Sequence, residues 1–181
     1  MGSAGLVSEA ERARHGTFVL ASPPLTSGAR TLGRVKTLAR TLDLTSWSVT
    51  NLFSLATRSV RDISVLGIDS SAWLAARSDL ESEVRRSTDL VLAFGVTRPS
   101  GRARSHFLDQ LEWLATQIEE VQPTCWSISD SPRHPSRWQR YTHRAYPDLA
   151  FEDALDLALT NVSPGALRGY RLNREGQDFA R

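Results

Sequence analysis

Four short apolar runs alternate with amphipathic segments along this chain. The runs are rich in β-branched and aromatic residues, and they predict buried strands at 17–21, 47–53, 89–95 and 124–129. Between them, apolar residues recur at helical spacing and predict helices around 32–42, from Ser70 or Ser71 to Val84, and at 107–118. Loops are expected at 54–67 and 97–104. Later segments predict a short helical piece near 139–143 and a longer helix at 151–159.

Alternation of strands with helices of this length predicts parallel pairing, with helices on both faces of the sheet. We therefore expect a three-layer α/β sandwich with a small, mainly parallel four-stranded sheet. The 181 residues suit one domain. The polarity of the ends predicts a flexible arm at 1–15, the domain at 16–160 and a polar tail at 161–181.

Composition argues against a disulfide, a metal site and a membrane segment. The only cysteine, Cys125, excludes an internal disulfide, and a buried thiol is favoured over a reactive one because its neighbours resemble a strand. The four histidines lack zinc-site spacing, so neither a metal nor a cofactor is predicted. No signal-like or membrane-length apolar run occurs, which predicts a cytoplasmic protein without a membrane partner.

Arginine supplies almost all of the positive charge. The net charge is only +2, and Lys36 is the sole lysine. Arginine binds phosphate and carboxylate through paired N–H groups, although a GC-rich gene also produces an arginine bias. The charge alone gives weak support for a nucleic-acid partner.

The segment 130–138 is the strongest candidate site. Two prolines restrict the residues before them, so Ser131 and His134 are held in extended geometry after the fourth strand. His134 is the natural acid, base or oxyanion donor because its ordinary pKa lies near neutrality. The candidate ligand-binding residues of this segment are Asp130, Arg133, Ser136 and Arg137. The alternative is a surface turn with solvated arginines.

Ligands of open parallel sheets bind outside the carboxyl ends of the strands. That rule adds Ser22, Pro23, Phe53, Phe94 and Gly95 to the candidate ligand-binding residues. Both phenylalanines are able to stack on a base, although such residues more often belong to the core.

Three further polar residues each have a second interpretation. Asn51 could read a base edge or could cap a loop. Arg34 could bind phosphate or lie on a solvated helix face. Asp69, the third candidate catalytic residue beside His134 and Asn51, could simply begin a helix.

Several of these residues resemble an uncharacterised bacterial and phage family, domain of unknown function 1643. The resemblance covers about 17–138 and includes Arg34, Asn51-Leu52-Phe53, Ala93-Phe94-Gly95 and 132–135. Where that family has Asn-Pro-Ser, an Asn-Asp pair and an arginine, this chain has Ser22-Pro23-Pro24, Ser70-Ser71 and Ala56. These departures weaken the case for catalysis more than the case for binding.

A more distant resemblance is to the uracil-DNA glycosylase superfamily. Those enzymes also have a proline-containing loop after the first strand and a late His-Pro-Ser loop, here His134-Pro135-Ser136. The resemblance implies that the histidine loop stabilises a departing base and grips DNA. Fold analogy does not establish function.

Three functions follow as hypotheses. The first is a protein that acts on a nucleobase, nucleoside or DNA, either as an N-glycosidic-bond hydrolase or as a catalytically weakened form of one. The second is a non-catalytic module that binds a nucleoside, nucleotide or nucleic acid. The third is a structural partner subunit. The sequence leaves the oligomeric state open.

Overall fold

A five-stranded sheet forms the middle layer of the computed structural model, which describes residues 13–169. Its strands are β1 (His15–Leu20), β2 (Ser46–Asn51), β3 (Asp89–Leu92), β4 (Thr124–Ile128) and β5 (Leu159–Asn161). They lie in the order β2-β1-β3-β4-β5. Neighbours among the first four are parallel, whereas β5 is antiparallel to β4. The predicted α/β class is confirmed, but the four-stranded sheet is wrong, because the sheet has five strands and is mixed.

The fifth strand was missed because it is only three residues long and directly follows a helix. Its first residue, Leu159, fits the apolar spacing of that helix. Pairing with β4 decides its conformation, with Trp126 opposite Asn161 and Ser127 opposite Thr160. A segment this short shows no alternation of its own.

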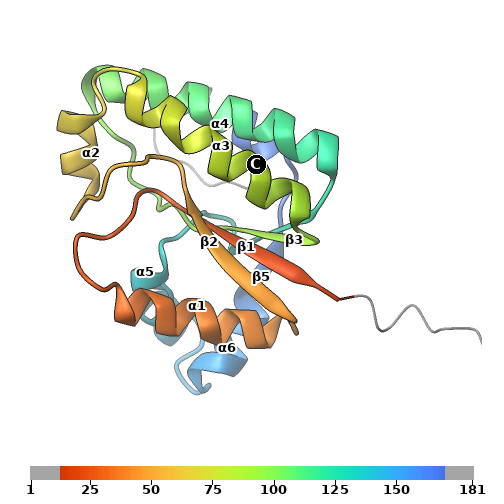
Figure 1. Cartoon of the computed structure of the whole chain (residues 1–181). Coiled ribbons are helices and arrows are strands. Elements are labelled where there is room, and N and C mark those ends of the chain that lie inside the picture. Colours follow the sequence, from red (N-terminus) through yellow and green to blue (C-terminus); the bar gives the residue numbers. More distant parts are fainter. Residues whose placement is uncertain (1–12, 170–181) are drawn as a thin grey trace, which may run out of the picture.

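Helices cover both faces of the sheet (Figure 1). One face carries α1 (Ala29–Thr41), α5 (Pro135–Ala145) and α6 (Phe151–Ala158). The other face carries α2 (Val60–Leu66), α3 (Ser71–Arg86), α4 (Gly101–Val121) and α7 (Gly165–Gly169). Successive strand residues serve opposite cores: Phe18 and Leu20 pack on the α1 side, and Val19 packs on the α3 side.

Four helical features differ from the sequence expectation. The segment 54–67 contains α2 rather than only a loop, and α4 begins within the expected loop at Gly101. Helix α5 begins at Pro135, a residue type that suits the first helical position. Leu167 of α7 is buried, so packing continues into the expected tail. The rest of the arm and tail, 1–12 and 170–181, lies outside the described residues.

Within residues 13–169, no helix has both the length and the apolar character needed to cross a membrane.

Candidate anion-binding site

The strand order places β1 and β3 side by side, with connections that diverge from each other. The chain leaves β1 through α1 on one face of the sheet, and it leaves β3 through α4 on the other face. Connections that diverge in this way open a ligand-binding crevice outside the carboxyl ends of the two strands. We call this end of the sheet the carboxyl edge; it lies on the left of Figure 1.

His134 lies at the carboxyl edge. It precedes the first residue of α5, and its Nδ1 accepts a hydrogen bond from the backbone N–H of Ser136 at 3.2 Å. A Cβ atom on Gly95 would lie only 3.8 Å from Cβ of His134. Gly95 has a φ of 93°, and its N–H donates to the carbonyl of Pro132 at 2.6 Å. The loops after β3 and β4 are therefore joined, and His134 and Gly95 lie close together.

The charge state of His134 follows from its surroundings. Burial lowers its pKa below the ordinary value, and the positive charges of Arg137 and Arg34 lower the pKa further. The ring is thus neutral at neutral pH. Because a backbone N–H can only donate, Nδ1 is the acceptor, and the proton of the neutral ring is on Nε2. Nε2 has no hydrogen-bond partner among the described residues, so it can donate to a ligand.

Arg34 joins the same cluster from α1. Its Nη2 donates to Oε1 of Gln139 on α5 at 3.3 Å. The predicted residues Arg34, His134, Ser136 and Arg137 are therefore close together, on two helices that are far apart in the sequence.

Ser22 and Pro23 hold two loops together. The Ser22 hydroxyl lies 2.5 Å from the Thr57 hydroxyl, and the Thr57 N–H donates to the Pro23 carbonyl at 2.9 Å. These contacts join the loop after β1 to the loop after β2. Both residues lie at the carboxyl edge.

Asn51 ends β2 with its amide oxygen buried. Thr50 donates to Asp79 on α3 at 2.6 Å, so Asn51, the next residue along the strand, faces the α1 side. Its Oδ1 has no hydrogen-bond partner within residues 13–169. Unpaired buried acceptors are rare in native proteins, which makes this atom a candidate ligand contact.

The two candidate carboxylates have local roles. Asp69 precedes α3, and its Oδ1 accepts hydrogen bonds from the hydroxyl and the backbone N–H of Ser71, the latter at 2.9 Å. These bonds lower the pKa of Asp69 and fix the start of the helix. Asp130 accepts from the hydroxyls of Ser129 and Ser131 at 3.1 and 3.2 Å. The geometry gives neither carboxylate a catalytic contact.

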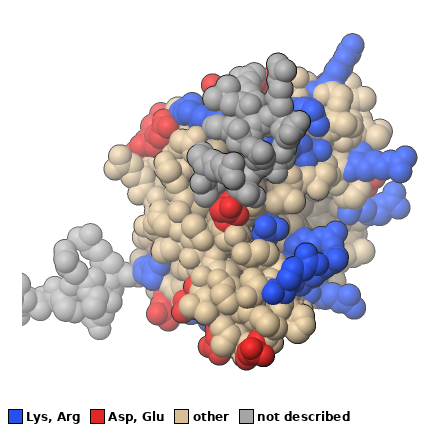
Figure 2. All heavy atoms as spheres, turned by 180° about the vertical axis from the view of Figure 1, so that it is seen from behind, with Lys and Arg blue, Asp and Glu red and all other residues tan. Residues whose placement is uncertain are grey.

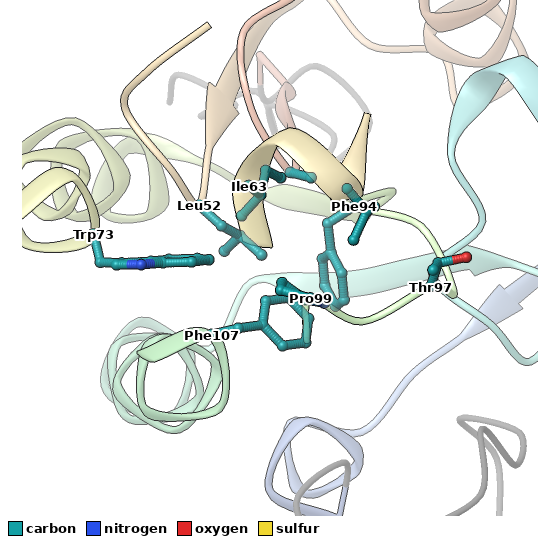
Figure 3. A pocket seen from close by; sticks show the side chains of 9 residues that line it. Leu52, Ile63, Trp73, Phe94, Thr97, Pro99 and Phe107 are labelled. Carbon is teal, nitrogen blue, oxygen red and sulfur yellow. The ribbon is translucent and has the colours of Figure 1, made fainter. Parts of the chain in front are cut away.

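The two predicted stacking residues belong to the core. Phe53 is fully buried, with its ring centre 4.8 Å from that of Trp73, and its role as a ligand contact stays a prediction. Phe94 is also buried and meets Phe107 edge to face. Phe94 does line a pocket with an empty volume of about 230 Å³, part of which is open to solvent (Figure 3). Thr97 contributes the one side-chain hydroxyl of its lining, so the pocket offers little for reading a base.

Sequence reasoning missed most of the arginines at this edge. A crossover helix begins where its strand ends, so its early residues lie at the carboxyl edge. Close to the starts of α1, α2, α4 and α5 lie the carboxyl-edge arginines: Arg30, Arg34, Arg61, Arg102, Arg104, Arg133 and Arg137. Arg58 also lies beside the start of α2, but it pairs with Asp62 and is not counted with them. Seen from behind, this edge is on the right of Figure 2, where blue side chains gather. Arginines at helix starts, where carboxylates are favoured, were the available signal.

Cofactor and family information adds no further assignment. Within residues 13–169, no cluster of three or more His, Cys, Asp or Glu side chains is arranged to hold a metal ion. Comparisons with protein-family models, curated proteins and solved structures find no match. The resemblances to domain of unknown function 1643 and to uracil-DNA glycosylases therefore stay predictions.

Proposed function

We propose that this protein binds nucleic acid at the carboxyl edge of its sheet, with the carboxyl-edge arginines contacting phosphates and His134 near the centre of the surface. The observation that carries the proposal is the unequal pairing of arginines. None of the carboxyl-edge arginines forms an ion pair with a carboxylate of the described residues.

Several arginines elsewhere in the fold have carboxylate partners. Arg14 pairs with Asp89, Arg40 with Glu152, and Arg168 with Glu119, each at 2.8 Å. On α3, Arg85 pairs with Glu81 and Arg86 with Glu83. The chain thus neutralises several arginines away from the carboxyl edge. At the edge, Arg58 pairs with Asp62 at 3.5 Å, whereas the carboxyl-edge arginines stay available for an external anion.

The helix dipoles add to the positive electrostatic potential at the carboxyl edge. The starts of α1, α4 and α5 have no acidic residue in their first turns, although carboxylates there would be stabilising. Helix N-termini and arginines both favour anions. Because the arginines come from four helices, an extended polyanion fits the arrangement better than a single phosphate.

N-glycosidic-bond hydrolysis is a second candidate, supported by one observation. The free Nε2–H of His134 is a suitable donor to a departing base, as in the first hypothesis from the sequence. However, Asp69 and Asp130 are both engaged in turns and are not placed to activate water. Binding therefore has more support than catalysis.

Fluorescence anisotropy with labelled oligo(dT) and with a labelled DNA duplex tests the proposal across a salt series. We expect affinity to fall steeply with salt, and Arg137→Ala to reduce the slope of log K against log salt by about 0.7–0.9. Arg85→Ala, which removes one charge at a paired site, is the matched control and should leave the slope unchanged. Absence of binding at low salt, or equal effects of the two variants, would overturn the proposal.

Release of free base from the same oligonucleotides tests the second candidate. Release by the unmodified protein that His134→Asn abolishes would establish hydrolysis. Binding without release would restrict the function to recognition.

A further inference from the structure

We infer that Arg133 and Tyr141 form a preorganised phosphate contact, in which the tyrosine ring positions the guanidinium. This inference rests on the proposed function and identifies one specific contact within it. The Arg133 guanidinium carbon lies 4.4 Å from the centre of the Tyr141 ring. Tyr141 is itself half-buried and packs against the core on the α1 side, so the ring is a firm support.

Stacking uses the face of the guanidinium and leaves its edge. All five N–H groups lie in the plane of the group and point past the ring. None of them donates to a described residue, and Nε is buried without a hydrogen-bond partner within residues 13–169. An arginine fork held in this way matches the oxygens of a phosphate.

The charge of Arg133 also lacks compensation inside the described fold. Its side chain is half-buried, and no carboxylate of residues 13–169 forms an ion pair with it. Partial burial of an unpaired cation is unfavourable in the free protein. An anionic ligand would remove this cost, and it would find the side chain already oriented.

The hydrogen bonds by which Arg133 holds the loop are made by its backbone and not by its side chain. Its carbonyl accepts from Nε1 of Trp138 at 2.7 Å, and its N–H donates to the Ser131 carbonyl at 2.7 Å. Both contacts remain when the side chain is replaced, so side-chain variants at this position should keep the loop conformation.

The test compares Tyr141→Leu, Tyr141→Phe, Arg133→Lys and Arg133→Gln by oligo(dT) anisotropy, with circular dichroism to verify folding. Loss of the ring in Tyr141→Leu should weaken binding about five- to ten-fold, whereas Tyr141→Phe should retain it. Arg133→Lys keeps the charge but loses the fork and the stacking, and should weaken binding to a similar extent. Arg133→Gln should also lower the salt slope by about 0.7–0.9.

The outcomes separate this inference from the proposed function. If Arg137→Ala weakens binding while Tyr141→Leu and Arg133→Gln bind like the unmodified protein, the phosphate contact is overturned and the function stands. If Tyr141→Phe is as weak as Tyr141→Leu, the phenol rather than the ring is responsible, and the stacking role is overturned. If the unmodified protein does not bind, both fail.

Discussion

Nδ1 of His134 lies 3.2 Å from the backbone nitrogen of Ser136, from which it accepts a hydrogen bond. The imidazole therefore caps α5 in place of the more usual hydroxyl or carboxylate. This contact determines the chemistry of the ring, because it directs the Nε2–H away from the helix and makes the neutral side chain a hydrogen-bond donor. A general base would need a free lone pair, which this arrangement does not offer.

The lowered pKa of His134 predicts that stability and binding depend on pH in opposite directions. Above an ordinary histidine pKa of about 6.5, the ring is neutral in the folded and unfolded states. As pH falls below that value, the unfolded state takes up the proton first, so stability decreases until pH reaches the folded-state pKa. A bound phosphate raises the pKa of the ring, so affinity for oligo(dT) should increase over the same range.

His134→Asn tests this pH dependence, because asparagine keeps the cap but does not titrate. Urea unfolding and anisotropy across pH should show smaller changes in the variant than in the unmodified protein. Identical pH profiles for the two proteins would argue against a role for His134.

Asn51→Val should separate stability from binding. Removing a buried acceptor that has no partner should leave the free energy of unfolding unchanged or raise it by about 1 kcal/mol, while binding weakens. The neighbouring Thr50→Val is the control: it removes the hydroxyl that donates to Asp79 and should lower stability by about 1–2 kcal/mol. Chemical denaturation measures both. A comparable loss of stability in Asn51→Val would indicate a structural role instead.

Asp89→Asn should destabilise the fold at the amino-terminal ends of the parallel strands, opposite the carboxyl edge. The Asp89 carboxylate is buried and accepts from Arg14, Trp126 and Thr88 at 2.8–3.2 Å. Burial raises its pKa, but these hydrogen bonds outweigh burial and hold the pKa below the ordinary value. Its stabilisation is therefore fully present above about pH 4 and is lost as pH falls through the folded-state pKa.

We expect Asp89→Asn to lower the free energy of unfolding at neutral pH by about 2–4 kcal/mol. The exposed pair of Arg40 and Glu152 provides the comparison, since Glu152→Gln should cost at most about 1 kcal/mol. Urea titrations at neutral and acidic pH would reveal the difference. Equal losses in the two variants would contradict the importance of burial at Asp89.

Cys125 should be unreactive in the native protein. Burial raises the pKa of its thiol to about 12, with a further contribution from the charge of Asp89. A thiol-specific chromogenic reagent should label the denatured protein at once and the native protein only as fast as it unfolds. Rapid native labelling would show that the site is open.

The pattern of apolar runs predicted much of this architecture, because β1 to β4 and the longer helices each carry a local signature. The apolar residues from Leu32 to Leu42 recur at helical spacing. Val91 and Leu92 continue an apolar run that only a strand buried on both faces explains. The rule that ligands bind at the carboxyl ends of parallel strands also assigned the segments that contain His134 and Gly95 to one end of the sheet. These features depend on residues that are neighbours in the sequence, or on a general property of parallel sheets.

Tertiary structure decided what depends on distant partners. Leu159 belongs to β5 because β4 offers an unpaired edge, a fact absent from its own neighbourhood. Phe53 is a core residue because Trp73 of α3 packs against it, and Asp69 is committed to Ser71 rather than to a ligand. Arg30, Arg61 and Arg102 contribute to one positive surface only because their helices begin at the same end of the sheet. Electrostatic fields add in space and not along the chain.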